Sequence, residues 1–207
     1  MKTTVIGATS ASGIELTKQL LQNGHAVYAL ARTPERLDIS GENLTIVKGD
    51  VLKPESLGPA IEKSKVVLSF LGPKGDQKTI AARGTENIVS EMKKKNVDRL
   101  IVISVAGIAV EEDERKKGFI DRLLKTFLKE MYADREAQLD VLHKSGLKWT
   151  ALRVPRLTNE SATGEVQAFF GKPSPSMKIC RADLAAFMIR EMKENKWVGK
   201  APIVASG

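Results

Sequence analysis

A chain of 207 residues, of which 42% are hydrophobic and 28% charged, is long enough to bury the core of one globular domain. This composition excludes a disordered tail, a collagen-like repeat and a mini-protein. The longest apolar runs, at 65–71 and 100–105, are much shorter than the roughly 20 residues that a membrane-spanning helix needs. We therefore expect a soluble protein.

The cysteine, histidine and charge counts narrow the class further. One cysteine, Cys180, cannot form an internal disulfide, and two histidines, His25 and His143, offer no metal-ligand spacing. The first seven residues enter a strand-like pattern at once, which leaves no room for a signal peptide. These features predict a cytoplasmic protein without a metal. The net charge of +8 favours an anionic partner: nucleic acid, a membrane surface or a phosphorylated small molecule.

Short apolar runs alternate with helical patterns along the whole chain. Strands are predicted at 3–6, 26–31, 44–47, 66–71, 99–104, 149–153 and 201–204, and helices near 14–21, 55–63, 77–95, 119–145 and 181–193. Strands that are buried on both faces and alternate with helices are typical of parallel sheets. We predict an α/β fold with a single Rossmann-type doubly wound parallel sheet and helices on both faces. One domain, 1–207, would include a small loop region at about 156–176 on the substrate side.

The segment 7–13, with the sequence GATSASG, joins the first predicted strand to the first predicted helix. Glycine at 7 permits a tight turn, glycine at 13 lets helix and strand pack closely, and the free N–H groups of the helix terminus can bind phosphate. Serine at 10 replaces the usual glycine, but its hydroxyl could donate to phosphate. The alternative is a Gly/Ser-rich loop without a ligand. The predicted phosphate-binding residues are Gly7, Thr9, Ser10, Ser12, Gly13 and Ile14.

The second predicted strand ends at Arg32, where an NAD-specific site would place an acidic residue. A guanidinium there can pair with the 2′-phosphate of NADP(H), and Arg36 follows one turn later as a second cation. Both arginines could instead be solvated surface residues. The pattern nevertheless favours NADP(H) over NAD(H).

Two more predicted strands end in residues that fit the same crevice. Asp50 and Val51 follow the third strand and could hold the adenine edge, although Asp50 could equally cap a turn. Leu71 and Gly72 end the fourth strand, and a small residue there lets a dinucleotide pass.

These segments together resemble a known family, the atypical short-chain dehydrogenase/reductases with NAD(P)-binding, NmrA-like folds. The similarity is greatest to the biliverdin-IXβ reductase / flavin reductase branch and covers nearly the whole chain. It is carried by the segments at 7–13, 31–37, 49–52, 84–89, 96–99, 145–149 and 181–184. The resemblance implies a Rossmann domain that holds NADPH below a flavin, bilin or other planar acceptor, with the cofactor supplying the hydride.

The same resemblance assigns residues at the nicotinamide end. The family's neighbours use a Tyr-x-x-x-Lys pair, but here Tyr132 is followed four residues later by Glu136, with Arg135 at the third position. Our alignment places Val105 where the bilin and flavin reductases have a serine, and Ser104 one residue earlier. Ser104 is the candidate catalytic residue, and both Ser104 and Val105 are predicted cofactor contacts. A serine that bonds only to its own backbone is the alternative.

Four residues at the end of the sixth predicted strand complete the candidate site. Arg153, Val154 and Pro155 stand where the family's backbone meets the nicotinamide amide. Arg156 could face an acidic group of the substrate, or form an ordinary surface ion pair.

Two functions fit these residues. The first is an NADPH-dependent oxidoreductase that reduces a flavin, a quinone-like compound or another planar conjugated acceptor by hydride transfer. The alternative is a non-catalytic NADP(H) sensor of the NmrA-like kind that acts through a protein partner. Nucleic-acid binding ranks last because aromatic residues make up 5% of the chain and the lysines are scattered. A membrane partner is not expected.

Overall fold

The computed structural model describes residues 1–72, 79–108, 110–111 and 128–207. Parts of two predicted helices, 77–78 and 119–127, lie outside these residues. The strands are β1 (Lys2–Ile6), β2 (Ala26–Ala31), β3 (Leu44–Lys48), β4 (Val66–Ser69), β5 (Arg99–Val105), β6 (Lys148–Val154), β7 (Arg156–Thr158), β8 (Val166–Phe169), β9 (Lys178–Cys180) and β10 (Ile203–Ser206). The α-helices are α1 (Ala11–Gln22), α2 (Gly58–Ile61), α3 (Ala81–Lys94), α5 (Lys129–His143) and α6 (Arg181–Glu194), with 3-10 turns η1 (Pro34–Arg36) and η2 (Pro54–Ser56).

The main sheet has eight strands in the order β3-β2-β1-β4-β5-β6-β10-β8. Strands β1 to β6 and β10 run parallel, and β8 pairs antiparallel with β10. Strands β2 and β3 are added on one side of β1, whereas β4, β5 and β6 are added on its other side. The strand order therefore reverses between β1 and β4. Ligands of such sheets bind beyond the carboxyl ends of the strands at this switch point. The predicted doubly wound α/β fold is confirmed.

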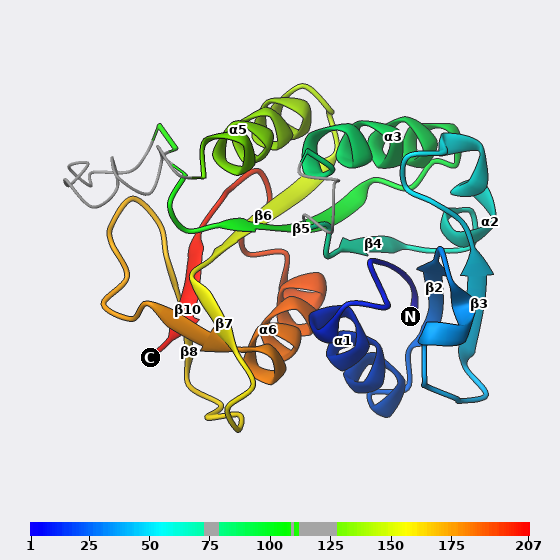
Figure 1. Ribbon diagram of the computed structural model, residues 1–207, viewed down its shortest axis with the longest axis horizontal. Helices are drawn as coiled ribbons and strands as arrows, with labels where there is room; N and C mark the ends of the chain where they lie inside the picture. The colour runs from blue at the N-terminus through cyan, green and yellow to red at the C-terminus, as the bar shows by residue number, and fades with distance from the viewer. Residues whose placement is uncertain (73–78, 109, 112–127) are drawn as a thin grey trace.

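Helices cover both faces of the sheet, as Figure 1 shows: α1 and α6 lie on one side, and α3 and α5 on the other. The strand residues alternate between two apolar clusters. Val5, Leu68 and Ile101 pack with α1 and α6, whereas Val67 and Leu100 pack with α3 and α5. Because both faces are buried, the strands read as continuous apolar runs in the sequence.

Two predicted features differ from the structure. The region 156–176 is more than a loop, because it contains β7 and the edge strand β8, and the antiparallel β8 makes the sheet mixed. The helix predicted at 55–63 is instead η2 followed by the single-turn α2. Pro59 explains the break, because a proline has no N–H to continue the hydrogen-bond ladder from the preceding turn.

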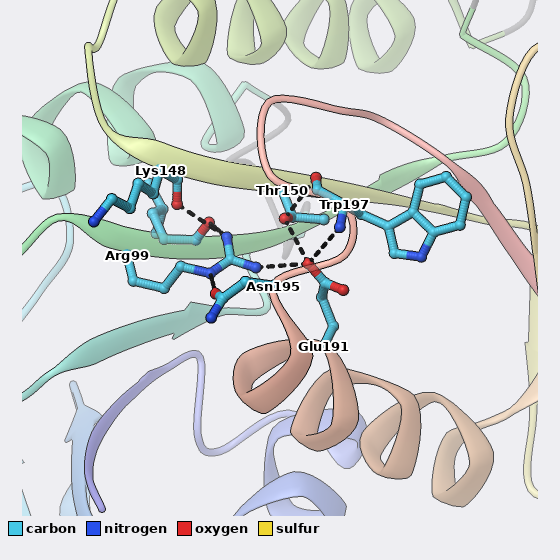
Figure 2. Close-up of polar contacts among 7 residues, drawn as sticks. Arg99, Lys148, Thr150, Glu191, Asn195 and Trp197 are labelled. Carbon is cyan, nitrogen blue, oxygen red and sulfur yellow. Dashed lines mark hydrogen bonds and ion pairs between the residues drawn. The ribbon is translucent and has the colours of Figure 1, made fainter.

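The amino ends of β5 and β6 hold a buried polar cluster, far from the switch-point end of the sheet (Figure 2). Arg99 NH2 donates to Glu191 Oε1 at 2.7 Å. The same oxygen accepts from Thr150 Oγ1 and the Trp197 amide. Because Glu191 belongs to α6 whereas Arg99 and Thr150 belong to β5 and β6, this cluster holds α6 against the sheet. None of the described helices is long and apolar enough to cross a membrane.

Candidate functional site

A crevice opens at the carboxyl ends of β1, β2, β3 and β4, at the switch point of the sheet. The sequence-predicted residues that line it are Gly7, Thr9, Ser10, Arg32, Asp50, Val51, Leu71 and Gly72. Its other walls are apolar and include Ile6, Leu30, Phe70 and Ile80, which the sequence analysis did not single out. The structure therefore brings eight predicted residues from four separate segments into one crevice.

The turn between β1 and α1 has room only for glycine at two positions. Gly7 has a φ of +80°, and a Cβ there would lie 2.6 Å from the carbonyl oxygen of Phe70. A Cβ on Gly13 would collide with the carbonyl oxygen of Gly7. These two glycines let α1 start directly above the end of β1, so its first N–H groups face the crevice.

Ser10 is the N-cap of α1. Its Oγ accepts a hydrogen bond from the Gly13 amide at 3.0 Å, and its own amide donates to Gly7 O. The cap uses a lone pair of the hydroxyl, and the hydroxyl hydrogen stays available to an anion in the crevice. Ser10 thus fits a phosphate although it replaces glycine. Ser12 is buried, and neither it nor the half-buried Ile14 lines the crevice.

Arg32 is exposed at the end of β2 and lines the crevice, across from the start of α1. Arg36 is exposed in η1 and is not part of the lining. Asp50 also lines the crevice, and its Oδ1 accepts from the Leu52 amide at 3.0 Å. Asp50 therefore caps its own turn, as the alternative predicted, and it also forms part of the crevice wall.

The residues predicted for the nicotinamide end lie at the ends of β5 and β6, outside the lining of this crevice. Ser104 is 1% exposed, and within the described part of the chain its Oγ has no hydrogen-bond partner. Val105 and Pro155 are half-buried and Val154 is buried, with its carbonyl accepting from the Ala106 amide. The structure brings these residues together, but their contact with a cofactor stays a prediction.

Arg153 and Arg156, both predicted for this region, differ in burial. Arg153 is completely buried, and its guanidinium donates from Nε to Ala201 O and from NH1 to Ile108 O. Its side chain therefore joins β6 to neighbouring segments. Its amide donates to Pro202 O, and its predicted backbone contact with a cofactor stays a prediction. Arg156 is exposed on β7, outside the crevice lining, where its amide donates to Met177 O.

Arg135 was not among the predicted site residues, but the structure places its guanidinium at the carboxyl ends of β4 and β5. Its NH2 donates to Leu71 O at 2.6 Å and its NH1 to Ile103 O at 3.0 Å. The signal was present in the sequence. Helical spacing puts Arg135 on the same face of α5 as Leu139 and Leu142, and a cation on an apolar face is unusual.

Tyr132 lies on the same helix but does not line the crevice. A Cβ on Gly107 would collide with the Tyr132 hydroxyl, so its ring packs against the turn after β5. Glu136, at the place of the lysine in a Tyr-x-x-x-Lys pair, is exposed.

Comparisons with known proteins agree with this geometry. The family model for NAD(P)H-binding proteins matches residues 7–195. The photosystem II assembly factor Ycf39 of Synechocystis sp. is 24% identical over 215 residues, which cover 100% of this chain and 63% of that protein. The chain thus spans less than two thirds of this relative.

Solved structures share the fold. A short-chain dehydrogenase/reductase from Veillonella parvula, determined in complex with NADP, has a TM-score of 0.79 at 20% identity, over 99% of this chain and 94% of that one. ChuY, an anaerobilin reductase from Escherichia coli O157:H7, has a TM-score of 0.78 at 15% identity, over 100% and 97%. At these identities the likeness concerns the fold alone.

Proposed function

Because this chain belongs to the NAD(P)H-binding family, we propose that it is an NADPH-dependent reductase that passes a hydride to a flavin, a quinone-like compound or another planar conjugated acceptor. The predicted family relationship is confirmed, whereas the narrower likeness to bilin and flavin reductases stays part of this proposal. The NADP complex and the reductase among the structural neighbours support it.

The observation that carries the cofactor preference is the position of Arg32 in the crevice wall. A guanidinium there is suited to a ribose 2′-phosphate, which NADPH has and NADH lacks. The phosphate-binding turn lies across the same crevice, so one dinucleotide could contact both. Gly7 and Gly13 let this turn pack closely against Phe70 and against itself, which holds Thr9 and Ser10 in the crevice wall.

The bound cofactor would supply the hydride from its nicotinamide, and the chain would bind and orient it. Gly7, Thr9 and Ser10 would hold the pyrophosphate, Arg32 the 2′-phosphate, and Leu71 with Gly72 the middle of the dinucleotide. Ser104 is our candidate for the hydroxyl nearest the reaction, because its Oγ has no partner among the described residues. The proton would come from this hydroxyl or from water.

Titration of the purified protein with NADPH and NADH tests the cofactor assignment. We expect tighter binding of NADPH and a loss of roughly 10- to 100-fold in its affinity in Arg32→Ala, since a hydrogen bond to a charged group contributes about 1.5–3 kcal/mol. NADH affinity should stay unchanged. Arg190→Ala, which removes an exposed arginine of α6, is the matched control. Equal affinities for the two cofactors in the unaltered protein would refute the role of Arg32.

Reductase activity needs a separate assay, in which NADPH absorbance is followed while flavins, quinones and bilins are added one at a time. Oxidation of NADPH with at least one class supports the enzyme. Cofactor binding without turnover across all classes would favour the second candidate.

That second candidate is a non-catalytic NADP(H) sensor acting through a protein partner. It is favoured by the burial of Ser104 and by the packing of Tyr132 against Gly107, which takes this hydroxyl out of the crevice wall. The Synechocystis relative is a photosystem II assembly factor, and a role of that kind also supports action through a partner. A partner whose affinity for this chain changes when NADPH is replaced by NADP⁺ would identify a sensor.

A further inference from the structure

Helix α5 buries two consecutive charged residues, Asp134 and Arg135, against α3 and the sheet. Their exposed fractions are 6% and 4%. Burying charges is costly, and apolar residues would pack here with less penalty. The position of these two side chains therefore calls for a reason beyond core packing.

Arg135 holds the ends of two strands. Its guanidinium bridges Leu71 O, just beyond β4, and Ile103 O, near the end of β5. Gln138, one turn along α5, accepts from Arg135 NH1 and donates to Thr85 Oγ1 of α3. The bridge fixes the spacing of β4 and β5 at the edge of the sheet where the crevice opens.

Asp134 holds the start of α3. Its Oδ2 accepts from the Ala81 amide at 2.8 Å and its Oδ1 from the Ala82 amide at 2.9 Å. The N-cap residue of α3, Ile80, has no side chain that could do this. A carboxylate from α5 therefore satisfies two of the amides that a helix N-terminus leaves free.

The two anchor points lie on either side of the connection from β4 to α3. Leu71, Gly72 and Ile80 all line the crevice, facing the phosphate-binding turn. Adjacent side chains of one helix thus fix both described ends of one crevice wall.

Arg135 also brings a positive charge behind this wall. Burial lowers its pKa to about 10, so the guanidinium stays charged at neutral pH. The negative charge of the neighbouring Asp134 opposes this decrease. Among the described residues, no carboxylate lies within ion-pair distance of the Arg135 guanidinium, and its Nε has no hydrogen-bond partner. A cation at the Leu71 carbonyl oxygen polarises the peptide group between Leu71 and Gly72, which makes the N–H of Gly72, a residue of the crevice lining, a stronger donor.

We propose that Asp134 and Arg135 are positioning residues for the dinucleotide: they hold in place the part of the crevice wall formed by Leu71, Gly72 and Ile80, and Arg135 strengthens the Gly72 amide as a donor. This inference rests on the proposed cofactor binding. It assigns the role to side chains that lie behind the wall and act through it.

The test compares Arg135→Met with Arg99→Met, which removes another buried arginine at the opposite end of the sheet. Melting temperature, NADPH affinity and amide hydrogen exchange are measured for both. We expect both variants to lose stability, but only Arg135→Met to bind NADPH at least tenfold more weakly and to exchange faster at 69–72 and 79–84. Arg135→Lys should recover part of the affinity, because an ammonium keeps the charge but cannot bridge both carbonyls. Asp134→Asn, a milder change, serves if Arg135→Met does not fold, and should weaken NADPH several-fold with faster exchange at 79–84.

The outcomes separate this inference from the proposed function. If the unaltered protein does not bind NADPH, the proposed function fails, while the exchange rates still decide whether the pair holds the wall. If NADPH binds and Arg135→Met matches Arg99→Met in both affinity and exchange, the positioning role is refuted and the proposed function stands.

Discussion

Loss of the buried Arg99–Glu191 pair should destabilise the protein without affecting the crevice. The two side chains are 7% and 1% exposed, and their charged atoms lie 2.7 Å apart. In Arg99→Met, Glu191 keeps bonds from Thr150 and Trp197 but loses its cation (Figure 2). Breaking one partner out of a buried pair costs about 3–5 kcal/mol. For a chain of this length, each kcal/mol lowers the melting temperature by about 2–4 °C, so we expect a decrease of roughly 6–20 °C.

A double-mutant cycle with Glu191→Gln measures this interaction by thermal and urea unfolding. Glutamine keeps an acceptor for Thr150 and Trp197 but removes the charge, so Arg99→Met should cost much less in the Glu191→Gln background. NADPH affinity should stay within twofold in every variant, because the pair lies at the amino ends of β5 and β6. Equal costs of Arg99→Met in both backgrounds would show that the pair contributes no coupling and would refute the reasoning.

Three further changes probe other parts of the molecule. Gly13→Ala would push a Cβ into Gly7 O, so we expect the free energy of unfolding to decrease by about 1–3 kcal/mol and NADPH binding to weaken. Gly41→Ala is the silent control, because a Cβ there would meet only the two methyl groups of Leu21, at 3.6 and 4.0 Å. Burial raises the pKa of Asp183, but hydrogen bonds from Thr163 and Gly164 outweigh this effect and lower the pKa below its usual value. The ionised Asp183 therefore stabilises the fold above the ordinary aspartate pKa, and this stabilisation is lost as pH falls below it. The melting temperature of Asp183→Asn should thus depend less on acid pH than that of the unaltered protein. Burial, with nearby positive charge, lowers the pKa of His25 below 6.5, so the stability of the protein should decrease as pH falls below that value. If the melting temperature of His25→Leu decreases with pH as much as that of the unaltered protein, His25 is not the cause.

The strands and the glycine turn at 7–13 were predictable because their signals are local. Buried parallel strands are apolar on both faces, and a turn that admits only glycine at 7 and 13 marks where β1 meets α1. Arg32 follows directly after its strand, so a strand boundary was enough to place it at the crevice. Each of these conclusions depends on residues within a few positions of one another.

The edge strand β8 could not be placed this way. Val166–Phe169 is short, lies in a region of loop-like composition, and is defined by antiparallel pairing with β10, about 37 residues later. A strand of four residues gains its stability from its partner rather than from its own sequence.

The sequence by itself determined the fold class, the glycine turn between β1 and α1, and the position of Arg32 at the end of β2. Only the tertiary structure decided which charged side chains lie behind the crevice, because Arg135 meets Leu71 across 64 positions and Asp134 meets Ala81 across 53. Helical spacing shows that these two residues face the core, but not which backbone groups they meet there. Those partners are set by the packing of α5 against α3 and the sheet, since a buried charge is stable only where carbonyls or amides are placed to receive it.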